Sequence, residues 1–166
     1  MTAFLISSDI YRTTHYGGKH PLNIPRVGPT LDLIKAMSWY SDTSFVNAPI
    51  AKPSLLEKFH SKDYINVLQE VDEKQKIDEY WSKKYNLGTP SNPLFKGMYK
   101  RPATSVGGAV VAAEYAFLYG RAFNLGGGFT HLTLTLIRSN ANPTVRRYGW
   151  PSFTRHVGEA ALRQQL

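Results

Sequence analysis

A strand that runs directly into three glycines is the feature that most restricts how this chain can fold. The strand is predicted over residues 122–125, the glycines occupy 126–128, and an aromatic residue and then His131 follow. A helix with small residues on one face is predicted just before it, over 103–119, and Gly120 ends that helix. This order is typical of an α/β protein, in which a parallel sheet carries helices on both faces. Ligands of such sheets bind beyond the carboxyl ends of the strands, where the glycines lie.

The earlier part of the chain divides into short elements and loops. Strands are predicted over 3–7 and 46–51, helices over 31–37, over 53–59 and from 62 onward, and loops over 11–29 and 74–101. Pro53 suits the first turn of a helix, and Ser61 suits an N-cap. The segment 74–101 contains two glycines and two prolines, and so long a loop in a compact domain is usually functional or disordered.

Composition excludes several classes of protein. The chain has 166 residues, 42% of them hydrophobic and 13% aromatic, which indicates one globular domain with a core. It contains no cysteine, so disulfides and thiolate metal sites are ruled out and a reducing compartment is favoured. The apolar run at residues 3–6 is too short for a signal peptide or a membrane span. We expect a cytoplasmic protein (or a nuclear one in a eukaryote) with no membrane partner.

Positive charge is concentrated near the end of the chain. The formal net charge is +8, from 20 basic and 12 acidic side chains. Residues 132–166 contribute half of this excess through one acidic residue, Glu159, and five arginines, which are Arg138, Arg146, Arg147, Arg155 and Arg163. A basic balance can indicate a nucleic-acid partner, but these arginines form no helical stripe and do not alternate with aromatic residues. Nucleic-acid binding is therefore not expected, and strongly salt-dependent DNA binding would contradict this.

Four segments occur in an order that points to one family. They are Gly18-Lys19-His20-Pro21 followed by Pro25-Arg26, Phe59-His60-Ser61-Lys62-Asp63-Tyr64-Ile65, Tyr85-Asn86-Leu87-Gly88 followed by Pro93-Leu94-Phe95-Lys96-Gly97-Met98, and Gly127-Gly128-Phe129-Thr130-His131. With the Gly107-Gly108-Ala109 opening of the long helix, they resemble the N-terminal half of the zinc-dependent deacetylases of the histone deacetylase and acetoin-utilisation type. The resemblance covers residues 3–131. It implies an arginase/deacetylase-like α/β fold that is truncated here, because the complete catalytic domain is longer.

The resemblance also implies a chemistry. In that family a zinc ion holds the acetyl carbonyl and a water molecule and lowers the pKa of the water. Two adjacent histidines act as base and electrostatic partner, an Asp-x-His pair and a later aspartate bind the zinc, and a downstream tyrosine polarises the carbonyl. By resemblance His131 is the candidate general base, Gly128 and Phe129 bind the substrate, an acetylated lysine or small amine, and Asp78 or Glu79 holds the substrate backbone.

The chain departs from the family pattern at two points. Thr130 stands where the family has the first histidine of the pair, so only His131 could act as the base. The last aspartate is Asp78, so no Asp-x-His triplet follows His131, and none occurs earlier. No metal ligand and no cofactor are therefore predicted for this chain alone, which is expected to be inactive by itself.

The resemblance stops abruptly at Thr130. We therefore divide the chain into residues 1–131, the N-terminal half of a deacetylase-like domain, and residues 132–166, a divergent basic tail. A frameshift or alternative splicing would produce such a tail. Within it, residues 132–136 alternate like a half-exposed edge strand or do so by accident.

Other interpretations stay open from the sequence. His131 could be a polar residue at a strand end with no catalytic role, and His20 and His60 are expected to be structural. The chain could be a non-catalytic half-domain with a binding role, because a sheet cut near its middle exposes a strand edge through which it would self-associate. A third alternative is a small basic module that binds nucleic acid.

Overall fold

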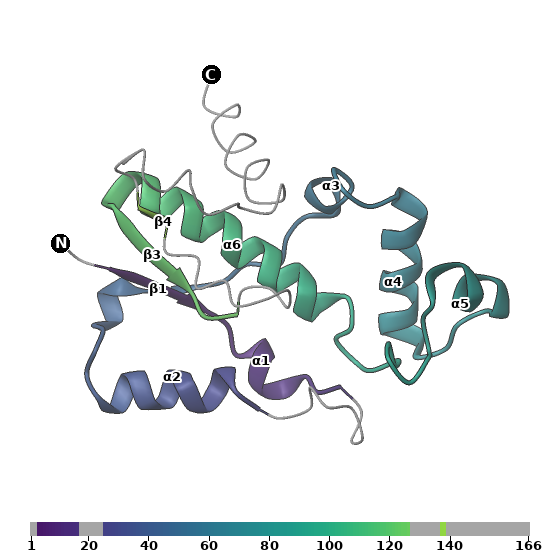
Figure 1. Cartoon of the computed structure of the whole chain (residues 1–166), viewed down its shortest axis with the longest axis horizontal. Helices are drawn as coiled ribbons and strands as arrows, with labels where there is room; N and C mark the ends of the chain where they lie inside the picture. Colours follow the sequence, from purple (N-terminus) through teal and green to yellow (C-terminus); the bar gives the residue numbers. More distant parts are fainter. Residues whose placement is uncertain (1–2, 17–24, 127–136, 139–166) are drawn as a thin grey trace.

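The computed structural model describes residues 3–16, 25–126 and 137–138, and within these ranges the chain forms an α/β fold (Figure 1). The strands are β1 (Phe4–Ser7), β2 (Phe45–Asn47), β3 (Arg121–Asn124) and β4 (Ile137–Arg138). Their order in the sheet is β2-β1-β3-β4, where β1 pairs parallel with β2 and β3, and β4 pairs antiparallel with β3. The predicted α/β class with a parallel sheet is therefore confirmed.

One long helix positions the rest of the fold. The helices are α1 (Ile10–Thr13), α2 (Val27–Ala36), the 3-10 helix η1 (Asp42–Ser44), α3 (Pro53–Leu56), α4 (Lys62–Lys74), α5 (Glu79–Tyr85) and α6 (Lys100–Tyr119). Helix α6 packs against β1 and β3, and α1 contacts both α2 and α6. Helices α4 and α5 lie beyond the N-terminal end of α6, away from the sheet (Figure 1). No helix in the described ranges is long and apolar enough to cross a membrane.

Small residues bring α6 onto the sheet, as the sequence predicts. Ala116 of α6 and Ala122 of β3 belong to one buried cluster and are 0% and 1% exposed. A Cβ atom on Gly107 would lie 2.0 Å from the carbonyl oxygen of Pro49, in the segment after β2. Only a glycine fits there, so the close packing of α6 depends on this position.

A second core joins α4 to the N-terminal part of α6. Its buried side chains include Ile65 of α4, Leu87 just after α5, and Ala103 of α6. Ser61 caps α4, since its hydroxyl oxygen accepts a hydrogen bond from the backbone N–H of Tyr64 at 3.3 Å. The N-cap predicted at Ser61 is therefore confirmed.

The prediction of a loop over all of 74–101 is wrong, because this segment contains α5. The helix begins after Asp78, whose carboxylate accepts a hydrogen bond from the backbone N–H of Tyr80. It ends at Asn86, which has the left-handed conformation common at helix ends. Both signals are local ones that the sequence contains.

Smaller differences concern other boundaries. The loop predicted over 11–29 includes most of α1 and the start of α2. Strand β2 already ends at Asn47, because Pro49 has no N–H to donate to a neighbouring strand. The helix predicted over 53–59 ends at Leu56.

Candidate functional site

The carboxyl ends of β1 and β3 lie side by side and define the candidate site. The strands pair with Ile6 opposite Asn124, and the backbone N–H of Leu125 donates to the carbonyl oxygen of Ile6 at 2.9 Å. Gly126, the first of the three glycines, therefore leaves the sheet beside the end of β1. This is the edge at which parallel sheets bind their ligands.

Most of the site residues predicted from the sequence lie outside the described residues. These are Gly128, Phe129, Thr130 and His131, and the alternating residues 132–136 lie outside as well. The roles given to these residues stay predictions.

Buried polar side chains surround the first glycine. Ser105 of α6 donates from its hydroxyl to the carbonyl oxygen of Gly126 at 2.5 Å, and Asn124 donates from Nδ2 to the carbonyl oxygen of Ser105 at 3.2 Å. Within the described part of the chain, the buried atoms Ser7 Oγ and Asn124 Oδ1 have no hydrogen-bond partner. Buried polar atoms of this kind are rare in folded proteins.

Tyr11 is a neutral phenol held under a cation. Burial raises the pKa of Tyr11 to about 12, and the nearby Ser105 hydroxyl and the charge of Arg101 oppose this rise only in part. The Arg101 guanidinium lies 5.4 Å from the centre of the Tyr11 ring and 5.5 Å from that of Tyr16. Arg101 also donates to the carbonyl oxygen of Thr14 at 2.6 Å. The Arg101 side chain of α6 therefore contacts both Tyr11 and Tyr16 and restricts the movement of their rings.

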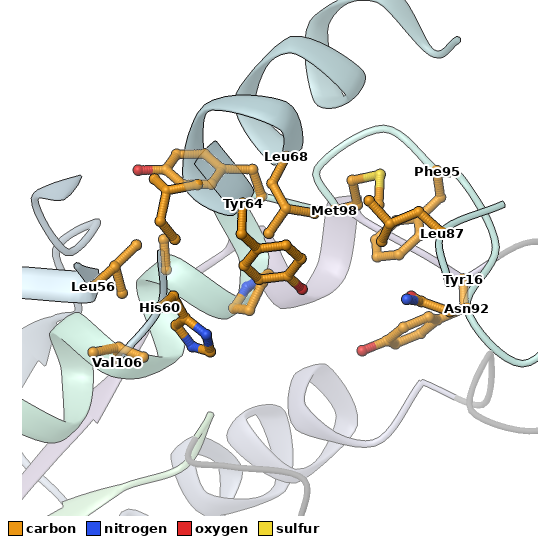
Figure 2. A pocket seen from close by; sticks show the side chains of 14 residues that line it. Tyr16, Leu56, His60, Tyr64, Leu68, Leu87, Asn92, Phe95, Met98 and Val106 are labelled. Atoms are coloured by element: carbon orange, nitrogen blue, oxygen red, sulfur yellow. The ribbon is translucent and has the colours of Figure 1, made fainter. Parts of the chain in front are cut away.

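A pocket of about 220 Å³ lies between α4, the start of α6 and the segment 87–99 (Figure 2). Its lining is mainly apolar and includes Leu68 of α4 and Met98. Tyr16 also lines it, so Arg101 contacts both the pocket wall and Tyr11 at the strand ends. A pocket of this size accommodates one small apolar group.

Aromatic rings and an imidazole stand around this pocket. Figure 2 shows Tyr64 and His60 together, with Tyr16 across the opening from them. The ring centroids of His60 and Tyr64 are 5.4 Å apart, and those of Tyr16 and Phe95 are 4.7 Å apart. Burial raises the pKa of Tyr64, and Tyr85 adds to this rise, so Tyr64 is also a neutral phenol. The sequence interpretation of His60 as structural missed its place in the pocket lining.

Asp78 and Glu79, the predicted contacts to the substrate backbone, both have local partners in α5. Asp78 Oδ1 accepts a hydrogen bond from the backbone N–H of Tyr80 at 2.8 Å. Glu79 forms an ion pair with Lys83 at 2.6 Å. Both acidic residues are exposed and neither lines the pocket. Their contact with a substrate stays a prediction.

The described residues do not by themselves fit a zinc site. Within residues 3–16, 25–126 and 137–138, no group of three or more His, Cys, Asp or Glu side chains is arranged to hold a metal ion. The described histidines, His15 and His60, are both exposed. The buried carboxylate of Asp72 is occupied by backbone N–H groups of Gly97 and Lys100.

The parallel sheet, the long helix and the glycines after β3 together define the class of protein, an α/β domain of the deacetylase type. The model of the histone deacetylase domain family matches residues 20–133. The chain therefore belongs to the histone deacetylase family.

Similarity to curated proteins also places the chain in this family. The acetoin utilization protein AcuC of Bacillus subtilis is 33% identical over 129 residues, which are 76% of this chain and 33% of that protein. AcuC of Staphylococcus aureus strain MSSA476 is 31% identical over 133 residues, with 78% and 33% covered. The chain thus spans about a third of the length of these curated relatives.

Solved structures support the same fold. The HDAC homologue from Aquifex aeolicus superposes with a TM-score of 0.75 and 30% identity, covering 99% of this chain and 42% of that one. An HDAC homologue complexed with SAHA gives the same TM-score at 28% identity. The fold is therefore that of the N-terminal part of these proteins.

Proposed function

We propose that this chain supplies the N-terminal part of an amide hydrolase that removes acetyl groups from lysine or a small amine. The observation that carries the proposal is the match of the histone deacetylase domain over residues 20–133, which contains the end of β3 and the glycines. In this proposal His131 is the general base, and Gly128 and Phe129 contact the substrate. All three follow β3 within seven positions of its last residue, Asn124.

We further propose that the chain does not catalyse this reaction alone. Thr130 replaces one histidine of the family pair, and no aspartate follows Asp78 in the sequence. The described residues also do not fit a zinc site. The zinc chemistry of the family would need ligands from elsewhere, in a longer chain or in a second one.

Two measurements on the purified chain test this second proposal. Elemental analysis should find no stoichiometric zinc, and a fluorogenic acetyl-lysine substrate should not be hydrolysed above the rate of the His131→Ala variant. Stoichiometric zinc with turnover that is lost in His131→Ala would overturn it.

A fusion tests the family function. Residues 1–131 of this chain would replace the matching segment of B. subtilis AcuC, and the fusion would be assayed on whichever acetylated amine the parent protein hydrolyses. Thr130→His should raise the activity, and His131→Ala in that background should abolish it. A folded fusion with Thr130→His that shows no hydrolysis would contradict the proposal.

We propose self-association as a second, non-catalytic function of the chain. Strand β2 is the end strand of the sheet and pairs with β1 alone among the described residues. Exposed backbone groups on a sheet edge bind another strand.

A further inference from the structure

The side chain of Tyr11 occupies the space that any residue larger than glycine would need at position 126. A Cβ atom on Gly126 would lie 2.1 Å from Tyr11 Cζ and 2.2 Å from both Cε2 and Oη. Gly126 is not one of the described glycines with a positive φ. The requirement for glycine is therefore steric and comes from Tyr11, which lies more than a hundred positions earlier in the chain.

A second contact holds Gly126 from the side of α6. The Ser105 hydroxyl donates to its carbonyl oxygen at 2.5 Å. The backbone of Gly126 is therefore held between the ring of Tyr11 and a hydrogen bond from α6. Leu125, the residue before it, is fixed by its own hydrogen bond to Ile6 at 2.9 Å.

Arg101 fixes the ring of Tyr11 itself. It lies one helical turn before Ser105, so both side chains leave the same face of α6. Its guanidinium is 5.4 Å from the Tyr11 ring, and its hydrogen bond to Thr14 at 2.6 Å holds the end of α1. Tyr11 is 5% exposed, so the ring has little room to move.

We propose that Tyr11, held by Arg101, is a positioning residue that sets where the chain leaves β3 at Gly126. The steric relationship stands on the described residues alone. Its consequence for catalysis, the direction from which His131 is presented, rests on the proposed function. Because the contact can be measured without zinc or substrate, failure of one proposal is distinguishable from failure of the other.

A double-mutant cycle on the full chain tests the contact. Gly126→Ala should raise the unfolding equilibrium constant of the chain strongly in the presence of Tyr11, because the clash destabilises the folded state. Tyr11→Leu removes Cζ, Cε2 and Oη, so Gly126→Ala should cost much less in that background. We expect a coupling of about tenfold in the unfolding equilibrium constant, within the range of residues in contact. Additive effects would overturn the proposal.

Tyr11→Phe is the matched control, because it keeps Cζ and Cε2 and removes only the hydroxyl. Gly126→Ala should remain as costly in Tyr11→Phe as in the parent chain. If Gly126→Ala fails to fold, folding of the Tyr11→Leu/Gly126→Ala chain would support the proposal. If that double variant also fails to fold, hydrogen exchange of the Tyr11→Leu chain tests the proposal instead.

Hydrogen exchange separates positioning from general stability. In Tyr11→Leu, the amides of Leu125 and Gly126 should exchange at least about tenfold faster, while those of α4 keep their rates. Tyr11→Phe should restore most of the protection. Equal acceleration in both segments would show a merely structural role and overturn the proposal.

Discussion

Asp72 of α4 accepts a hydrogen bond from the backbone N–H of Gly97, although 25 positions separate them in the chain. The other carboxylate oxygen accepts one from the N–H of Lys100 at 3.3 Å. The N-cap residue of α6, Tyr99, makes no side-chain cap. Asp72, which is 7% exposed, therefore caps α6 from a different helix and ties the two sides of the pocket together.

The Asp72→Asn variant should be less stable than the parent chain by about 2 kcal/mol, because a buried acceptor of charge-assisted hydrogen bonds is replaced by a neutral amide with a single oxygen. The free energy of unfolding in urea measures this. Glu73→Gln is the matched control, since Glu73 is the exposed neighbour on α4 and should stay within about 0.5 kcal/mol. Equal losses in the two variants would contradict the capping role.

The close approach of α6 to the segment after β2 gives a second prediction. Gly107→Ala places a Cβ atom 2.0 Å from the backbone oxygen of Pro49, which has no rotamer that could move it away. Overpacking of this kind costs typically about 1–3 kcal/mol, and the free energy of unfolding should fall by at least that amount.

Gly28→Ala on α2 is the control for this effect. The atoms nearest to a Cβ there belong to the flexible Arg12 side chain, at 3.2 Å. That side chain can shift, and alanine favours the helix, so the variant should be as stable as the parent within about 1 kcal/mol. If the Gly107→Ala chain is as stable as the Gly28→Ala chain, the close contact between Gly107 of α6 and the backbone oxygen of Pro49 is contradicted.

Sequence reasoning predicted the parts of the fold that depend on local signals. The small face of α6, the strand before Gly126 and the N-cap at Ser61 follow from spacing and residue type. Helix α5 is short and has no buried residue, so hydrophobic periodicity gives no signal for it. The cap at Asp78 is the signal for this helix that the sequence does contain.

The long-range contacts could not be predicted in the same way. Nothing near Asp72 in the sequence indicates that its partner is Gly97. The same holds for Tyr11 and Gly126, because the sequence places the glycine at the end of a strand, while the steric reason for a glycine there lies in α1. Tertiary packing decides such pairs, and a single sequence carries no record of it.

High pH should destabilise the chain through Tyr11. Its pKa is raised by burial from 10.0 to about 12, so between these values the unfolded state loses the proton that the folded state keeps. The stabilising contribution of the protonated Tyr11 phenol is fully present below pH 10 and is lost as the pH rises toward 12. The free energy of unfolding should fall by up to about 1.4 kcal/mol per pH unit in this window.

Tyr11→Phe should show a flatter dependence over the same pH range. Urea unfolding at pH 9, 10 and 11 would measure it, with Tyr80→Phe as the control at a tyrosine that is 60% exposed. The difference between the two variants isolates the buried phenol from the other tyrosines. Parallel curves for both would contradict a raised pKa at Tyr11.

An edge of the sheet predicts self-association at β2, which is the end strand of the sheet among the described residues. Within the described ranges β2 pairs with β1 alone and its Asn47 is exposed, so its other edge can accept a strand from a second copy. Sedimentation velocity should show a dimer that forms with rising concentration. Asn47→Lys should weaken it, because a charged side chain opposes pairing at an edge.

Phe117→Lys separates this mechanism from simple apolar contact. Phe117 is 61% exposed near the end of α6, so it offers apolar surface without a strand edge. If the β2 edge is the interface, Phe117→Lys keeps the dimer and Asn47→Lys loses it, while circular dichroism shows both variants folded. The opposite result would place the interface on α6, and a monomer at every concentration would contradict self-association, because an available strand edge would then have found no partner.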